Sequence, residues 1–241
     1  MGGAEQLTYS SLFTLFFTLT FVCLHGQDFK DDHSDSWYIV VNDSQLNERW
    51  SIPTIGIIRY HDVFENREFS FISSGLRYST QKNSSFTLGV AYLNAETHEQ
   101  PLIDTASSQI WLFESFTIKH PLVRGLIDQR FRLESRWIQN STEDFFTNRI
   151  RYRIQYIRPI YKKTFLRMFN ELFVNLDESF FNQNRFYVGF GQKLSKTFTF
   201  DMGYLKNHFP NENRDVLRMC LTITSDFKKK DLAYVESPDI K

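Results

Sequence analysis

The sequence predicts an all-β fold, an antiparallel up-and-down transmembrane β-barrel of about 10–12 strands. Three observations lead to this prediction. Short segments along most of the chain alternate apolar and polar side chains with a period of two, which gives a strand one apolar and one polar face. Phe, Trp and Tyr make up 17% of the residues, and membrane barrels use aromatic side chains in girdles. After the N-terminal segment, no apolar run is long enough for a membrane-spanning helix.

Residues 1–26 are expected to form a signal peptide for export. Ser11 to Leu24 is a fourteen-residue run without charge, too short to span a bilayer as a helix and typical of the apolar part of a signal. Gly26 places a small residue at the cleavage position, and Val22 before Cys23 argues against a lipoprotein signal. The alternative is a retained apolar N-terminus.

The remaining chain is expected to divide into a polar leader (27–35), a barrel domain (36–227) and a charged C-terminal tail (228–241). Cys220 is the one cysteine after the signal, so no disulfide can form within the exported chain. The 28 basic and 28 acidic residues balance, which argues against a nucleic-acid surface.

Eleven segments of the barrel domain have the strand pattern, and turn-forming residues separate them. The expected strands cover 36–42, 48–60, 67–79, 85–95, 109–119, 127–138, 147–158, 165–176, 185–194, 197–206 and 215–227. Among the expected turns are Asn42 to Ser44, Asp177 to Asn184 and Asn207 to Asn213. Because bacterial single-chain barrels have even strand numbers, one segment is expected to be wrong, split or outside the closed sheet.

The last expected strand is apolar on one face and ends near an aromatic residue. That face carries Leu217, Met219, Leu221, Ile223 and Phe227. A C-terminal strand of this kind resembles the assembly signal of outer-membrane barrels, although here the charged tail follows it.

The segment from Arg130 to Tyr156 has the clearest alternation of charged and apolar side chains. In a soluble barrel or sandwich, Ile150, Tyr152 and Ile154 would be buried and the arginines wet. In a membrane barrel, the apolar face meets lipid and the arginines face the interior. The second arrangement is the main hypothesis.

The polar face of the strands is expected to form a lumen-lining network of paired charges. Its predicted members are Arg77, Arg130, Arg132, Glu134, Arg136, Arg149, Arg151, Arg153, Glu171, Arg185 and Asp201. Arginine binds carboxylates through two parallel hydrogen bonds, and basic residues outnumber acidic ones in this set. A structural network that fills a narrow lumen is the first interpretation, and an anion-guiding passage is the second. Gly189 and Gly191 are expected to leave room for large inward side chains or to permit a bend.

No sequence motif points to catalysis, so no catalytic, cofactor-binding or metal-binding residue is predicted. His33, His61, His98, His120 and His208 lie near expected strand ends or loops, without metal-ligand spacing or a nucleophile elbow. An outer-membrane enzyme that modifies lipids would assemble its groups from several strand ends, and it stays open as an alternative.

Several blocks of the barrel domain resemble a known family. They are RFRLESRW (130–137), NRIRYRIQYIRPI (148–160), NELF (170–173), NQNRFYVGFGQKL (182–194) and DMGYLKN (201–207). In order and spacing they are similar to the blocks of the Gram-negative domain of unknown function 2490 family. The resemblance implies an outer-membrane-type β-barrel without an established catalytic site. IWLFESF (110–116) is more apolar than the corresponding strand of that family, and the tail after Phe227 is a second departure.

Together these observations predict a non-enzymatic β-barrel in the outer membrane of a Gram-negative bacterium, structural or weakly channel-forming. Its expected partners are outer-membrane lipid and, during biogenesis, the barrel-assembly machinery. A soluble exported barrel that binds an apolar ligand is the alternative.

Overall fold

The computed structural model describes residues 34–61, 64–80, 83–95, 107–140, 143–177 and 180–227. The expected signal peptide, most of the leader, His33, His98 and the C-terminal tail lie outside these residues. No helix long and apolar enough to cross a membrane occurs within these ranges.

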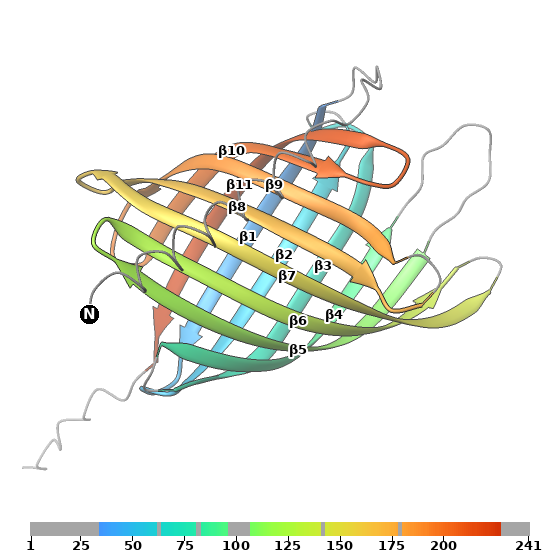
Figure 1. Ribbon diagram of the computed structural model, residues 1–241, viewed down its shortest axis with the longest axis horizontal. Coiled ribbons are helices and arrows are strands. Elements are labelled where there is room, and N and C mark those ends of the chain that lie inside the picture. The colour runs from blue at the N-terminus through green and yellow to red at the C-terminus, as the bar shows by residue number, and fades with distance from the viewer. Residues whose placement is uncertain are drawn as a thin grey trace, which may run out of the picture. The chain divides into compact units, whose positions relative to one another are not determined.

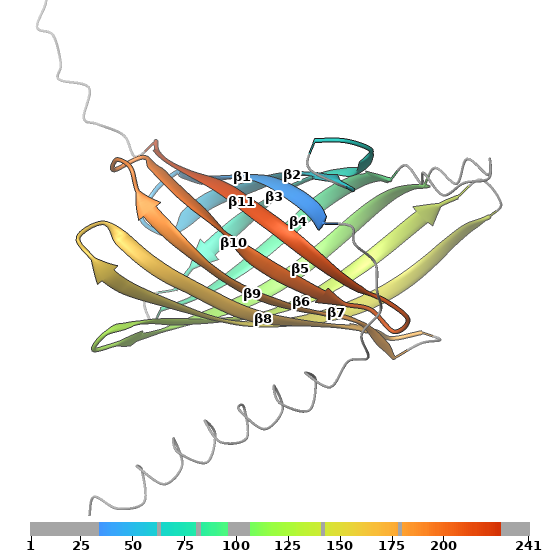
Figure 2. The same ribbon diagram turned by 90° about the horizontal axis from the view of Figure 1, so that it is seen from above.

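Eleven strands form the fold (Figure 1). They are β1 (Ser34–Gln45), β2 (Trp50–Tyr60), β3 (Arg67–Ser79), β4 (Ser84–Ala95), β5 (Ser107–Leu122), β6 (Gly125–Gln139), β7 (Asp144–Tyr161), β8 (Thr164–Asn175), β9 (Phe181–Lys193), β10 (Phe198–His208) and β11 (Asn213–Asp226). Each strand pairs antiparallel with the next one along the chain, and all cross the barrel obliquely (Figure 2). The predicted all-β barrel is therefore confirmed.

The barrel closes through a parallel pair of β1 and β11, which runs in register from Ser34 opposite Asp215 to Gln45 opposite Asp226. The expected even strand number is wrong, because all eleven segments belong to the closed sheet. When strands alternate in direction, an odd number leaves the first and last strands parallel. A parallel ladder satisfies the backbone groups of both strands, so the odd number leaves no open edge.

Several expected boundaries differ from the structure, among them those of β1 and β9. Asn42 to Ser44 is not a turn but part of the end of β1, where the backbone pairs with β2 and β11. β1 begins at Ser34, inside the expected leader. β9 begins at Phe181, so the turn predicted over Asp177 to Asn184 is shorter. Turn-forming residue types set these predictions, but pairing with neighbouring strands decides where a strand ends.

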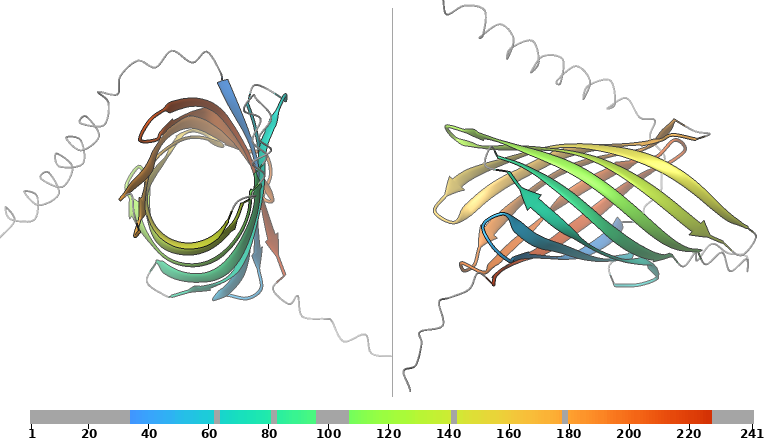
Figure 3. Two further views of the ribbon diagram at one scale, coloured as in Figure 1. Left: turned by 90° about the vertical axis from the view of Figure 1, so that its right-hand side faces the viewer. Right: turned by 90° about the horizontal axis from the view of Figure 1, so that it is seen from below.

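The two faces of the wall differ in the way the alternation predicts. On β6, Arg132 and Glu134 point into the lumen and are buried, whereas Leu133 and Trp137 point outward and are exposed. The end-on view shows a closed ring of strands around this lumen (Figure 3). The closed sheet thus collects one face of every strand inside a single compartment.

Glycines on the inner face make room for aromatic rings, which was the first of the two roles expected for them. A Cβ atom on Gly191 would overlap the ring of Phe165, and one on Gly189 would overlap the Tyr187 hydroxyl group. Phe165 and Tyr187 are nearly fully buried. These glycines therefore let bulky side chains lie flat against the inner wall.

Candidate functional site

All eleven residues of the predicted network lie on strands of the barrel and face its lumen. The structure brings them together in four groups rather than in one continuous ladder. The members of the largest group come from β6, β7 and β8, which are consecutive strands of the wall.

Two buried carboxylates organise the largest group. Glu134 accepts hydrogen bonds from Arg149 Nε (2.8 Å) and Nη2 (2.6 Å) and from Arg151 Nη1 (2.6 Å). Glu171 accepts from Arg151 Nη2 (2.9 Å) and from Arg130 Nη2 (2.7 Å). Arg151 therefore links the two carboxylates across β6, β7 and β8. Such charge-assisted hydrogen bonds fix the relative positions of strands in a low-dielectric interior.

A second group surrounds Asp201 on β10. This carboxylate has no exposed surface and accepts hydrogen bonds from Arg218 Nη1 (2.7 Å) and the Tyr187 hydroxyl group (3.0 Å). Arg167 Nη1 lies 3.5 Å from its second oxygen atom. The adjacent strands β9 and β11, and β8 beyond β9, thus supply partners to one acid on β10.

Two predicted residues form separate pairs, and two have weak polar contacts. Arg77 donates to Asp43 at 2.7 Å, and Arg153 donates to Asp128 at 3.0 Å. Arg136 Nη2 lies 3.4 Å from the Asn175 side-chain oxygen, and Arg185 Nη2 lies 3.3 Å from that of Gln183. Neither Arg136 nor Arg185 forms an ion pair with a described residue.

Arginine and aromatic side chains also stack across the lumen. Arg59 lies between the rings of Phe69 (4.0 Å) and Trp37 (3.7 Å), measured from its guanidinium carbon to each ring centre. Arg185 continues the stack between Trp37 (4.9 Å) and Phe173 (4.4 Å). An aromatic face attracts a guanidinium group more strongly where water is excluded.

The stack extends to the opposite part of the wall. Arg149 lies 5.1 Å from Phe173 and 5.2 Å from Trp111, and the Trp111 ring packs against Phe71 with 5.2 Å between centres. It therefore begins and ends on β3, at Phe69 and Phe71, after passing through β2, β1, β9, β8, β7 and β5. Side chains from most of the wall meet in this layer, which we call the arginine–aromatic stack.

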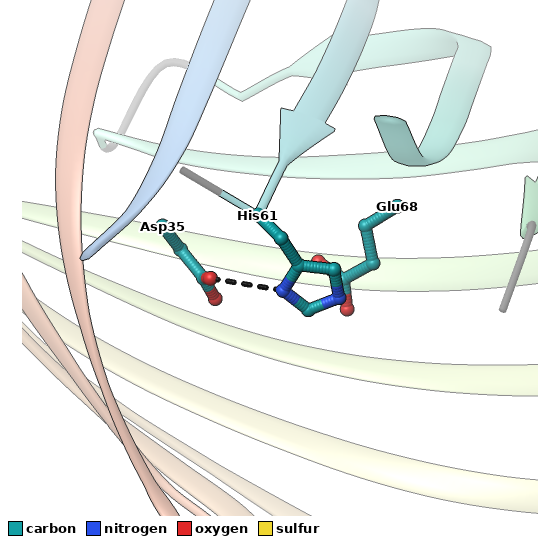
Figure 4. A group of neighbouring side chains, drawn as sticks. All are labelled: Asp35, His61 and Glu68. Carbon is teal, nitrogen blue, oxygen red and sulfur yellow. Dashed lines mark hydrogen bonds and ion pairs between the residues drawn. The ribbon is translucent and has the colours of Figure 1, made fainter. Parts of the chain in front are cut away.

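A further charged cluster lies at one rim of the barrel (Figure 4). His61 follows β2, and its Nδ1 is 3.1 Å from an Asp35 carboxylate oxygen. This hydrogen bond raises the pKa of His61 above its ordinary value. Glu68 lies beside the pair, and the ligand atoms of the three residues lie within 4.8 Å of one another.

The rim cluster has the donor set of a cation site, but arginines already balance its acids. Arg214 Nη1 is 2.9 Å from Glu68 and 3.9 Å from Asp35, and Arg59 Nη1 is 3.6 Å from Glu68. A divalent cation would have to displace these arginines. The arrangement fits an ion-pair cluster better than a metal centre.

Several lumen residues were missed by the sequence analysis: Trp37, Arg59, Arg167, Phe173, Tyr187 and Arg218. A signal was present for Arg59, because it shares the inner parity of Ile55 and Ile57 on β2. The partners across the lumen had no signal, because they lie on strands far apart in the chain.

The outer face of the wall is apolar, and several polar side chains on it pair with one another. Asn170 and Asn184 exchange two hydrogen bonds of 2.9 and 3.1 Å. Ser135 donates to Asn148 at 2.9 Å, and the Tyr152 hydroxyl group donates to Gln129 at 2.8 Å. These hydrogen bonds between side chains reduce the cost of placing polar groups in an apolar environment. The outer face also has an apolar groove of about 550 Å³ at Gly56, where a side chain is missing.

Glu114 is the exception on the outer face. It lies at the middle of β5, is exposed, and pairs in register with Leu88 and Leu133. No described residue forms a hydrogen bond or ion pair with its carboxylate.

The fold and its lumen define a closed β-barrel with an apolar outer wall and an ionic, aromatic interior. The family model for proteins of unknown function DUF2490 matches residues 34–218, most of the barrel, and the chain belongs to this family. The chain has no match among the curated proteins or among the solved structures.

Proposed function

We propose that this chain is an integral outer-membrane β-barrel protein whose lumen is filled by its own side chains and whose role is structural. The observation that carries the proposal is the separation of side chains between the two faces. Arg149 in the lumen is 6% exposed, whereas its neighbour Ile150 on the outer face is 40% exposed. Lipid is the solvent that favours such an outer face.

The alternative of a soluble exported barrel requires the opposite arrangement. It expects Ile150, Tyr152 and Ile154 in a buried core and the arginines in water. In the structure, these three side chains are on the outer face, and the arginines of β7 are in the lumen. The geometry therefore argues against an apolar ligand in the interior.

Membrane fractionation of cells that express the full chain tests the proposal. We expect the protein in the outer-membrane fraction, and we expect its electrophoretic mobility to change on boiling, since barrels resist detergent until heated. Recovery entirely in the soluble periplasmic fraction would overturn the membrane assignment. The expected partners are outer-membrane lipid and the barrel-assembly machinery.

A weak channel is the second candidate, because basic groups dominate the lumen. Burial of the central side chains favours a closed lumen, since Glu134, Phe173 and Tyr187 have essentially no exposed surface. Single-channel recording in planar bilayers distinguishes the two. We expect no steady conductance from the native chain. A conductance whose anion preference changes in Arg151→Glu or Arg153→Glu would favour the passage.

We propose a non-enzymatic role. The side chain of His208 contacts Asn213 at 2.5 Å, and that of His61 contacts Asp35. Replacing each histidine of the exported chain by alanine, followed by an envelope-lipid profile, tests the enzymatic alternative. A changed profile in any variant would support a lipid-modifying enzyme instead.

A further inference from the structure

Positive charge exceeds negative charge in the centre of the lumen. Six guanidinium groups surround three carboxylates there, an excess of three. The arginines are Arg130, Arg132, Arg149, Arg151, Arg153 and Arg185, and the acids are Asp128, Glu134 and Glu171. Guanidinium groups stay protonated in proteins, and a buried charge without a counter-charge is costly. The excess therefore requires compensation.

Arg132 differs from the other five arginines because each of them donates a hydrogen bond to a described side chain. Its side chain is 8% exposed and lies over the Phe113 ring, with the guanidinium carbon 4.1 Å from the ring centre. Its nearest acid is Glu134, at 3.7 Å, which already accepts three hydrogen bonds from Arg149 and Arg151. Arg132 donates no hydrogen bond to any residue in the described ranges.

The residues around Arg132 add positive charge instead of neutralising it. In the antiparallel register, Arg132 is directly opposite Arg151, and Arg130 is directly opposite Arg153. Like charges directly opposite each other destabilise a pair of strands. The Nε–H groups of Arg130, Arg132 and Arg153 are buried without a hydrogen-bond partner. An anion at this place would accept hydrogen bonds from the buried donors and would also neutralise the clustered positive charges.

We propose that the lumen binds a small inorganic anion at Arg132, with Arg130 as a second donor. The ligand class is a halide or a tetrahedral oxyanion such as phosphate, because guanidinium N–H groups form charge-assisted hydrogen bonds with compact anions. The Phe113 ring, which stacks with the Arg132 guanidinium group, keeps that group in place. The anion acts as a fixed counter-ion within a closed barrel, so the inference requires no transport.

Anion-dependent stability of the purified full-length protein in detergent tests the proposal. Chloride or phosphate replaces gluconate at constant ionic strength, and tryptophan fluorescence follows thermal unfolding. We expect the midpoint of the native chain to rise and then saturate as the bound anion is added, because a ligand of the folded state stabilises it by mass action. A rise with chloride alone identifies a halide site, and a rise with phosphate alone identifies an oxyanion site.

Two variants separate a specific site from a general salt effect. Arg132→Met removes the uncompensated charge, so we expect no saturable response and a midpoint in gluconate at or above that of the native chain. Arg124→Met alters an exposed arginine between β5 and β6 and should keep the full response. An unchanged native midpoint with both anions, or a response retained in Arg132→Met, would overturn the proposal.

Bromide diffraction provides a measurement that does not depend on how the variant folds. In crystals of the native chain soaked in bromide, we expect an anomalous peak within hydrogen-bonding distance of the Arg132 guanidinium group. A map with no peak in the lumen would count against the site. Both experiments use detergent-solubilised protein, so their outcome is independent of the fractionation test of membrane location.

Discussion

The guanidinium group of Arg185 lies 4.9 Å from the centre of the Trp37 ring, although β10 and β11 separate their strands in the wall. Trp37 also contacts Arg59 on its other neighbour, β2, at 3.7 Å. One ring therefore joins two arginines that are 126 positions apart in the sequence. The arginine–aromatic stack holds the wall together across the lumen, in addition to the hydrogen bonds between adjacent strands.

Replacement of Trp37 by leucine should interrupt this stack. Both Arg59 and Arg185 would lose an aromatic face, which we expect to lower the free energy of unfolding by about 1–4 kcal/mol. Denaturant unfolding in detergent, followed by gel mobility, measures the loss. Trp137→Leu on the outer face is the matched control, and an equal loss in both variants would contradict a special role for Trp37.

Removal of the Glu134 charge should destabilise the barrel more than any surface change. Glu134→Gln leaves Arg149 and Arg151 without their shared carboxylate, and breaking a buried ion pair costs about 3–5 kcal/mol. The same unfolding assay measures this loss. Glu143→Gln, in the exposed turn before β7, should change stability by less than about 0.5 kcal/mol. A similar small change in Glu134→Gln would show that the buried network contributes little.

Glu114 provides a test of the environment of the outer face. In lipid, Glu114→Leu should raise the free energy of unfolding by about 1–2 kcal/mol, and Leu112→Glu, two residues away on the same face, should lower it by a similar amount. Unfolding from lipid bilayers measures both changes. If the face meets water, both changes should stay within about 0.5 kcal/mol.

The rim cluster should make stability depend on pH. Because the pKa of His61 is raised in the folded state, its protonated form is stabilised by folding. That contribution is fully present below the unfolded pKa of about 6.5 and is lost as the pH rises through the higher folded value. Thermal midpoints between pH 5 and 9 should therefore fall more steeply in the native chain than in His61→Gln. Parallel curves would refute the coupling of His61 to Asp35.

Two glycines on opposite faces should respond oppositely to alanine. Gly191→Ala would force a Cβ atom into the Phe165 ring, and overpacking of this kind costs about 1–3 kcal/mol. Gly56→Ala points into open space on the outer face and should stabilise β2 by about 0.5–1 kcal/mol. Unfolding midpoints of the two variants check the contrast. Equal effects would show that the inner wall can adjust.

The strands and the direction of their faces could be predicted from sequence, because alternation with a period of two is a local property. Arg130, Arg132 and Glu134 share a parity, and so they must share a face wherever the strand lies. Every predicted strand overlaps an observed one, and the predicted and observed ends differ by at most four residues.

The partners of these side chains could not be predicted, since they depend on the closure of the sheet. Glu134 meets Arg149 because β6 and β7 are neighbours in register, which the turn between them suggests. Arg185 meets Trp37 across the lumen, although β10 and β11 lie between their strands in the wall. The alternation of side chains within a strand also could not predict His61 beside Asp35. His61 lies just after the end of β2, where the alternation stops, and Asp35 lies on β1.

The parallel pairing of β1 with β11 has a consequence for the two ends of the barrel. Ser34 lies opposite Asp215, near the start of β11, and Gln45 lies opposite Asp226, at its end. The chain therefore enters the barrel at one rim and leaves it at the other. If the barrel spans a membrane, Ser34 and Phe227 face different compartments. A reporter placed at each of these two positions would be accessible from opposite sides, unlike in a barrel with an even number of strands.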